Sequence, residues 1–128
     1  MAERPRRPAA RQAADHGAAR LAGQWAARLT QDKHADRIVV LDMRRVSGVT
    51  DYFVICSGGS TRQVQAIADH ISEGARARGR RIWHKEGYQD AQWVLLDCGD
   101  VVVHVFHPAA RAFYNLEQLW GDVPRLTR

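Results

Sequence analysis

The stretch WVLLDCGDVVVHVF, from Trp93 to Phe106, contains two apolar runs separated by a short segment around Gly99. This pattern predicts two antiparallel strands joined by a tight turn at Cys98-Gly99 or Gly99-Asp100. A two-residue turn would pair odd positions of the first strand with even positions of the second. One face of the hairpin would then be purely aliphatic and suited to pack against helices: Val94, Leu96, Val101, Val103 and Val105. The other face would mix large apolar groups with acids: Trp93, Leu95, Asp97, Asp100 or Val102, His104 and Phe106.

The segments on either side of this hairpin alternate between helical and strand-like patterns. We expect a helix at about 16–32, strands at 37–43 and 51–57, and a capped helix from Ser60 to Gly79. A strand is expected at the start of 80–88, and a last helix follows Pro108 with Phe113, Leu116 and Trp120 on one face. The order α-β-β-α-β-β-β-α predicts a single α/β domain with helices packed on a mixed sheet. We expect a disordered Arg/Ala-rich tail at 1–15, the domain at 16–122 and a C-terminal tail at 123–128.

The 128-residue chain has a net charge of +5, and that charge is unevenly distributed. Residues 76–85 contain five basic side chains and no acid, whereas residues 86–128 contain three arginines against six acids. A basic cluster of this kind suggests contact with nucleic acid, but the hairpin itself lies in the acidic part. No apolar run reaches the ~20 residues of a membrane helix. Two cysteines without a CxxC spacing fit a reducing cytoplasm, which is the expected location.

Catalytic patterns are weak in this sequence. The segment GGSTRQ between a strand and a helix could bind phosphate through backbone N–H groups, but neither GxxxxGK[ST] nor GxGxxG is present. Nucleotidyltransferases need two carboxylates at positions i and i+2 to hold a catalytic metal, and no such pair occurs. Nothing marks Cys98 beside His104 as an activated nucleophile. We therefore expect no enzyme activity, no cofactor and no metal site.

Two blocks of the chain closely resemble the signature segments of the ribosomal silencing factor (Iojap) family. They are TDYFVICSGGSTRQVQAIADHI, residues 50–71, and EGYQDAQWVLLDCGDVVVHVFHPAARAFYNLEQLW, residues 86–120. The likeness extends over about residues 17–122. It implies a nucleotidyltransferase-like fold without the catalytic carboxylates.

The resemblance also implies a function and a surface. Family members repress translation by binding large-subunit ribosomal protein fourteen, which blocks an intersubunit bridge and keeps the subunits apart. Free members tend to form homodimers. The family's partner-binding surface carries over to Trp93, Asp97, Cys98, Asp100, His104 and Phe106, preceded by Glu86 and Gly87. At Cys98 the family usually has a bulkier apolar residue.

Two other functions are weighed against this one. A nucleotidyltransferase-like enzyme would bind nucleotides and divalent metals. A ribosomal-RNA-binding module would use the basic run of Arg76, Arg78, Arg80, Arg81 and Lys85, and its binding would depend steeply on salt. The hairpin face with Trp93 could be open as a binding platform or covered by a helix.

Overall fold

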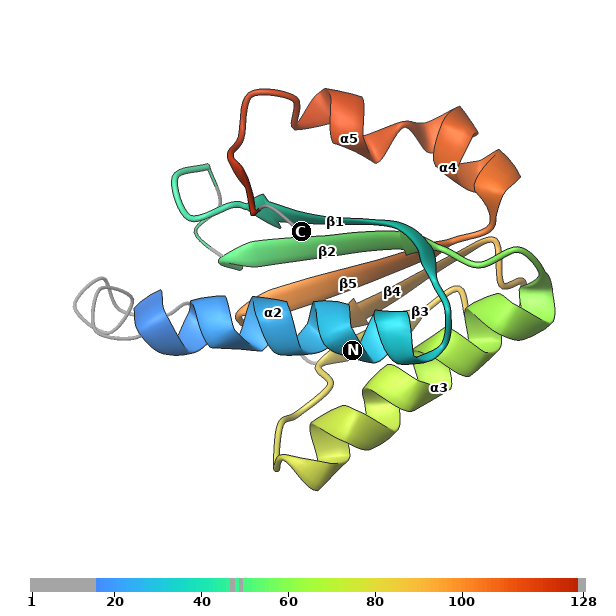
Figure 1. The fold of residues 1–128 in the computed structure, drawn as a ribbon, viewed down its shortest axis with the longest axis horizontal. Coiled ribbons are helices and arrows are strands. Elements are labelled where there is room, and N and C mark those ends of the chain that lie inside the picture. The colour runs from blue at the N-terminus through green and yellow to red at the C-terminus, as the bar shows by residue number, and fades with distance from the viewer. Residues whose placement is uncertain (1–15, 47, 49, 127–128) are drawn as a thin grey trace.

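The computed structural model describes residues 16–126 except 47 and 49, so the tail predicted at 1–15 lies outside the described residues. Figure 1 shows one sheet between two layers of helices. The elements, in chain order, are α2 (His16–Asp32), β1 (Asp36–Asp42), β2 (Tyr52–Ser57), α3 (Thr61–Ala77), β3 (His84–Glu86), β4 (Trp93–Asp97), β5 (Val101–Phe106), α4 (Pro108–Tyr114), α5 (Leu116–Leu119) and β6 (Arg125–Leu126).

The six strands form a single mixed sheet in the order β3-β4-β5-β2-β1-β6. Strands β2 and β5 are parallel, and every other pair of neighbours is antiparallel. Strand β2 therefore lies inside the sheet, as its apolar sequence on both faces predicts. The predicted α/β class and the mixed sheet are confirmed.

The β4–β5 hairpin has the predicted even register. Trp93 pairs with Phe106, and Asp97 pairs with Val102. The Cys98 N–H donates to the Val101 carbonyl at 2.8 Å, which leaves Gly99 and Asp100 as the two turn residues. Gly99 has φ +95°, the left-handed conformation that a tight hairpin needs at its first turn position. Val102 rather than Asp100 is thus the partner of Asp97 on the mixed face.

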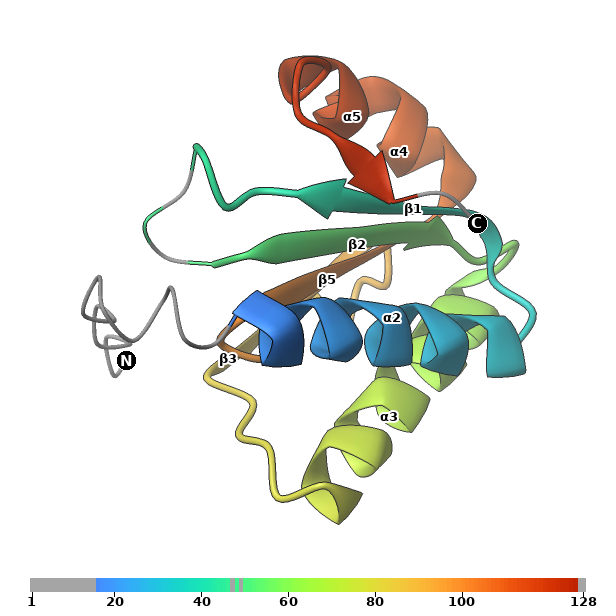
Figure 2. The same ribbon diagram turned by 60° about the vertical axis from the view of Figure 1, so that its left-hand side comes forward.

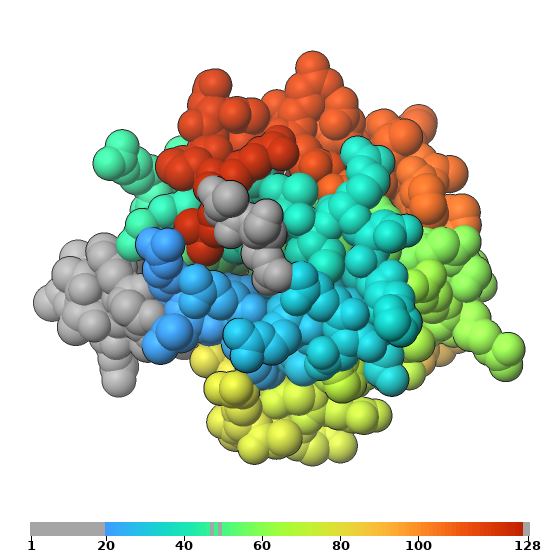
Figure 3. All heavy atoms as spheres, in the orientation of Figure 1, coloured from blue at the N-terminus to red at the C-terminus, as the bar shows by residue number. Residues whose placement is uncertain are grey.

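Each face of the sheet is covered by its own pair of helices (Figures 1 and 2). Helices α2 and α3 pack on the aliphatic face, where Val94, Leu96 and Val103 are fully buried. On the opposite face α4 and α5 lie over a smaller cluster that contains Leu41, Ile55 and Phe106. The space-filling view shows the atoms of α4 and α5 as a continuous layer along one edge of the molecule (Figure 3).

Helix α3 begins at a cap that the sequence predicts. The Ser60 hydroxyl accepts the N–H of Gln63 at 3.1 Å, and the Gln63 side chain accepts the N–H of Gly59 at 2.7 Å. The return bond of the capping box is therefore displaced by one residue, from Ser60 to Gly59. At the other end Gly79 has φ +70°, so the chain leaves the helix where a glycine was expected to end it.

The C-terminal region differs from the prediction in two ways. The expected single helix is interrupted at Asn115, whose φ of +46° ends α4 and starts α5, and Phe113 is 80% exposed instead of facing the core. Asparagine tolerates this left-handed conformation better than most residues, so the break has a local cause. The expected tail at 123–128 is also wrong, because Leu126 in β6 pairs with Val40 and completes the sheet.

Candidate partner-binding surface

Trp93 connects the hairpin to the helices that cover it. Its indole N–H donates to Nδ1 of His104 at 3.1 Å, and its ring stacks on Phe106 with the ring centroids 5.1 Å apart. The centroid of the Tyr114 ring, on α4, lies 4.8 Å from that of the Trp93 ring. Trp93 is partly buried, so it is neither a free anchor nor a fully enclosed core residue.

Most of the rest of the mixed face is covered, so of the two alternatives that the sequence leaves open, the helix-covered face is the one found. His104 and Phe106 are 4% and 0% exposed. The Phe53 ring makes T-shaped contacts with two other rings. Its centroid lies 4.6 Å from that of His104 and 6.3 Å from that of Trp120. A face with this many aromatic rings gains more from burial under α4 and α5 than from exposure to water. His104 and Phe106 can therefore influence a partner only through the residues they support.

The acidic residues of the hairpin make internal contacts. Asp97 and Cys98 are buried, and one Asp97 carboxylate oxygen accepts the Gly99 N–H at 3.0 Å, which shapes the turn. Asp100 forms an ion pair with the guanidinium of Arg80. Asp97 shapes the turn and Asp100 holds it to the loop that follows α3, so these two acids of the hairpin are engaged within the domain.

Burial also decides the ionisation of the hairpin's reactive-looking side chains. It raises the pKa of the Cys98 thiol to about 12, and the buried Cys56 thiol has its pKa raised to about 12 as well. It lowers the pKa of His104 to about 3. A protonated thiol and a neutral imidazole that accepts from Trp93 do not form a thiolate–imidazolium pair.

Glu86 and Gly87 lie at the edge of the sheet, next to the Trp93 strand. Both residues are exposed, and Glu86 pairs with Leu95 on the same face as Trp93. Gly87 has φ +80°, and a Cβ atom there would lie 2.0 Å from the carbonyl oxygen of Trp93. Gly87 is therefore required by the backbone, which it lets approach Trp93 closely.

Two exposed aromatic rings of α4, next to Trp93 of β4, complete this surface. We use the name aromatic patch for Trp93, Phe113 and Tyr114. Phe113 and Tyr114 are 80% and 53% exposed, with their rings 5.0 Å apart. Sequence reasoning missed Phe113 and Tyr114 as surface residues because one continuous helix would turn Phe113 inward. The available signal was Asn115, because asparagine tolerates the left-handed conformation that ends α4 there.

Helices α4 and α5 are tied to the sheet by a buried arginine that the sequence did not single out. Arg111 is 2% exposed, and it donates to Glu117 at 2.8 Å and to the Ser57 hydroxyl at 2.8 Å. The guanidinium holds the pKa of Glu117 below its usual value. This contact crosses the break at Asn115 and fixes α5 relative to β2, so the aromatic patch has a rigid base.

The glycine-rich loop before α3 uses its own donors. The Gly58 N–H donates to the Phe106 carbonyl at 2.9 Å, and the Gly59 N–H donates to Gln63. A tight turn and a helix cap therefore account for these donors without a phosphate. Among the described residues there is no group of three or more His, Cys, Asp or Glu placed to hold a metal ion. No helix within the same part of the chain is long and apolar enough to cross a membrane.

The fold and the surface together define a mixed α/β domain with an aromatic patch at one edge of its helical layer. The family model described as "Ribosomal silencing factor during starvation" matches residues 17–128, and the chain belongs to this family. A ribosomal silencing factor of Bacillus subtilis is 54% identical over 99 residues, which are 77% of this chain and 84% of that protein.

Two further comparisons extend this result. A crystal structure of a protein from Bacillus halodurans superposes with a TM-score of 0.77 at 46% identity, over 85% of this chain and 99% of that one. A more distant mouse relative, named "Mitochondrial assembly of ribosomal large subunit protein 1", is 32% identical over 110 residues. These are 84% of this chain and about half of the mouse protein (48%).

Proposed function

We propose that this chain represses translation in the cytoplasm by binding the large ribosomal subunit and preventing it from joining the small subunit. The contact proposed is with ribosomal protein fourteen, at a position that blocks an intersubunit bridge. The names of the relatives support a ribosome-associated silencing role, and the mouse relative's name refers to the large subunit. The observation that carries the proposal is the aromatic patch, which combines two exposed rings with a partly buried tryptophan.

The geometry suggests how the patch would bind. Tyr114 and Phe113 present large apolar surfaces that lose little conformational freedom on binding, as is typical of interface anchors. Glu86 is exposed on the Trp93 side of the sheet edge. Such a surface suits a basic protein partner. In this proposal Asp97, Cys98, Asp100, His104 and Phe106 hold the patch in place from below.

The experiment is co-sedimentation of the purified protein with free large subunits and with assembled ribosomes. The wild type should sediment with free large subunits only. Tyr114→Ala should weaken this binding about thirty-fold, because truncation of an aromatic anchor typically costs ~2 kcal/mol. Leu21→Ala is a matched control, since Leu21 is also exposed (67%) but lies on α2, across the sheet from the patch. Equal binding to assembled ribosomes, or equal loss in both variants, would contradict the proposal.

In the free protein, a second copy would cover the same patch, which gives the homodimer we propose. Sedimentation equilibrium should then show a concentration-dependent dimer that Tyr114→Ala weakens and Leu21→Ala does not. A strict monomer at high concentration would remove the dimer from the proposal and leave ribosome binding untouched.

The enzyme alternative has no observation in its favour, because the described donors of the glycine-rich loop are bound internally and the carboxylate pair is absent from the sequence. Calorimetric titration with ATP, GTP and Mg²⁺ should show no saturable binding. Saturable binding at micromolar concentration would restore the nucleotidyltransferase interpretation.

A further inference from the structure

The basic run between α3 and β3 divides into two groups with different contacts. Arg78 and Arg80 lie over the Trp25 ring at 5.2 and 5.6 Å, and Arg80 also pairs with Asp100. Arg81 lies over the Trp83 ring at 3.9 Å. These contacts hold the loop to its surroundings. Lys85 makes a similar contact with the Tyr88 ring, at 4.3 Å, so what distinguishes Lys85 from Arg78 and Arg81 is its position at a pocket.

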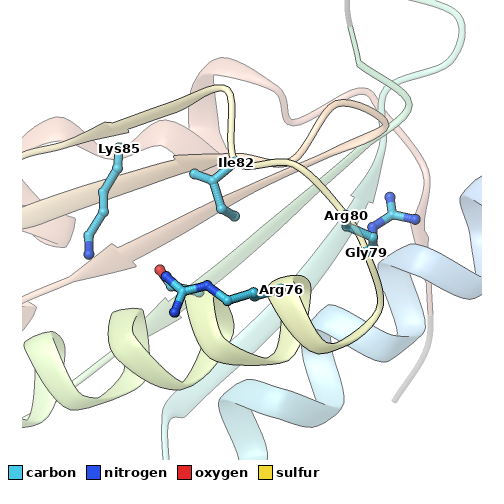
Figure 4. Close-up of a pocket in the computed structure, with 6 residues that line it drawn as sticks. Arg76, Gly79, Arg80, Ile82 and Lys85 are labelled. Atoms are coloured by element: carbon cyan, nitrogen blue, oxygen red, sulfur yellow. The ribbon is translucent and has the colours of Figure 1, made fainter.

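Arg76 and Lys85 form the second group. They line a pocket of about 540 Å³ between the end of α3 and the edge strand β3, together with Ser72, Gly79, Arg80 and Ile82. Figure 4 shows the charged ends of Arg76 and Lys85 at the same end of this pocket, whereas Arg80 lines its other end. Within the described residues neither Arg76 nor Lys85 has a carboxylate within ion-pair distance.

The pocket also contains an unused hydrogen-bonding group. The Ser72 hydroxyl is buried and has no hydrogen-bond partner. Asp69, an acid of α3, accepts from the Tyr88 hydroxyl at 3.0 Å, and Lys85 lies 4.3 Å over that Tyr88 ring. Arg76 lies in the last turn of α3, where a cation interacts favourably with the helix dipole. The dipole accounts for one cation, but not for the second cation or for the buried hydroxyl.

We propose that this pocket binds a backbone phosphate of ribosomal RNA. Two converging cations and a hydroxyl donor are the groups that bind phosphate oxygens, and a pocket of this size is typical of small-ligand sites (~300–1,000 Å³). Lys85 faces α3, because it pairs with Leu96 of the aliphatic face, so the pocket opens on the opposite side of edge strand β3 from Glu86. The inference rests on the proposed function: a ribosomal protein would bind the aromatic patch while RNA contacts the pocket around the edge strand.

The test uses the full chain and a fluorescein-labelled 20-nucleotide single-stranded RNA, titrated at several salt concentrations. The double variant Arg76→Gln/Lys85→Gln should bind about tenfold more weakly. The slope of log affinity against log salt should fall by about 0.7, because the pocket holds one phosphate and each phosphate contact on a single strand contributes about 0.7. Ser72→Ala should weaken binding about threefold without changing the slope, since it removes a donor and no charge.

The matched control is Arg78→Gln/Arg81→Gln, which removes the same charge outside the pocket and should weaken binding less than threefold. Equal losses in the two double variants would overturn the proposal, because binding would then follow net charge. Competition by poly-glutamate as effective as that by unlabelled RNA would also overturn it, in favour of an acidic protein partner. Melting temperatures should be unchanged for the Arg76 and Lys85 substitutions, because both side chains are exposed.

Failure of this inference can be told apart from failure of the proposed function. Tyr114→Ala should lose large-subunit binding and keep the affinity for the RNA oligonucleotide. If the wild type bound large subunits but the pocket variant bound RNA normally, only the phosphate site would be wrong. If the wild type did not sediment with large subunits, the proposed function would be wrong whatever the oligonucleotide showed.

Discussion

Acidification should destabilise this protein between pH 6.5 and 5 through one side chain, His104. The imidazole is buried, and its Nδ1 accepts the indole N–H of Trp93 at 3.1 Å. Burial lowers the pKa of His104 from 6.5 to about 3. As the pH falls below 6.5, the His104 imidazole of the unfolded chain binds a proton. The same ring in the folded protein stays neutral until the pH approaches 3.

The sign and the size follow from proton linkage. Below pH 6.5 the unfolded state binds one more proton than the folded state, so the free energy of unfolding falls as the pH falls. The slope approaches ~1.4 kcal/mol per pH unit. Between pH 7 and pH 5 the free energy of unfolding should fall by about 2 kcal/mol, and the loss continues until the pH reaches the folded-state pKa.

Urea unfolding at pH 7, 6 and 5 measures this effect, with His104→Asn as the matched control. Asparagine places an oxygen near the position of Nδ1, so it can accept from Trp93, but it does not titrate. The paired carboxyl groups Glu117 and Asp42 have pKa values lowered from 4.5 and 3.8 by their arginine partners. The stability that these two carboxyl groups contribute is lost mainly as the pH falls below 4.5, which lies below the window from pH 6.5 to 5.

The difference in unfolding free energy between wild type and His104→Asn should change by about 2 kcal/mol over this window. Every other histidine is present in both proteins and cancels in the difference. If both proteins lost stability in parallel, His104 would be titrating normally in the folded state. The conclusion that a buried, neutral imidazole supports Trp93 would then be wrong.

Three substitutions test the support of the aromatic patch. Gly87→Ala should lower stability by more than ~2 kcal/mol, because the added Cβ would lie 2.0 Å from the Trp93 carbonyl oxygen in a left-handed conformation; a variant that melts like the wild type would refute this backbone. Arg111→Met should cost about 3 kcal/mol by thermal unfolding, because it leaves Glu117 and Ser57 without their buried partner, and Glu117→Gln should cost less than half of that. Trp93→Ala should lower both stability, by about 3 kcal/mol, and subunit binding, since it removes the ring stacked on Phe106 and the donor to His104; a variant impaired in binding alone would show a more exposed anchor.

The parts of the fold that depend on local pattern could be predicted from the sequence. The hairpin register follows from strict alternation around Gly99, and the cap at Ser60 follows from its spacing to Gln63. Both are short-range consequences of side-chain period and backbone chemistry. The helix at His16–Asp32 has the same origin in its apolar spacing.

The parts that failed do not follow from side-chain periodicity. The short strand β6 exists because Leu126 reaches β1, a contact between residues more than eighty positions apart that no local pattern encodes. The break at Asn115 is stabilised by the bond from Arg111 to Glu117 across it, and nothing in the periodicity distinguishes this arrangement from a straight helix. The break at Asn115 leaves Phe113 exposed on α4.

The candidate site shows why a recognisable sequence block and a contact surface need not coincide. The hairpin carries the most distinctive part of the sequence, yet Asp97, Cys98, His104 and Phe106 are all buried. Their chemistry specifies a turn, a neutral imidazole and a ring stack, and the imidazole and the ring stack contact Trp93. Trp93 in turn contacts Tyr114, so the surface that a partner would meet is displaced from the strand to the helix that covers it. A substitution in the buried set should therefore alter binding in proportion to the stability it removes, whereas one at Tyr114 should alter binding alone.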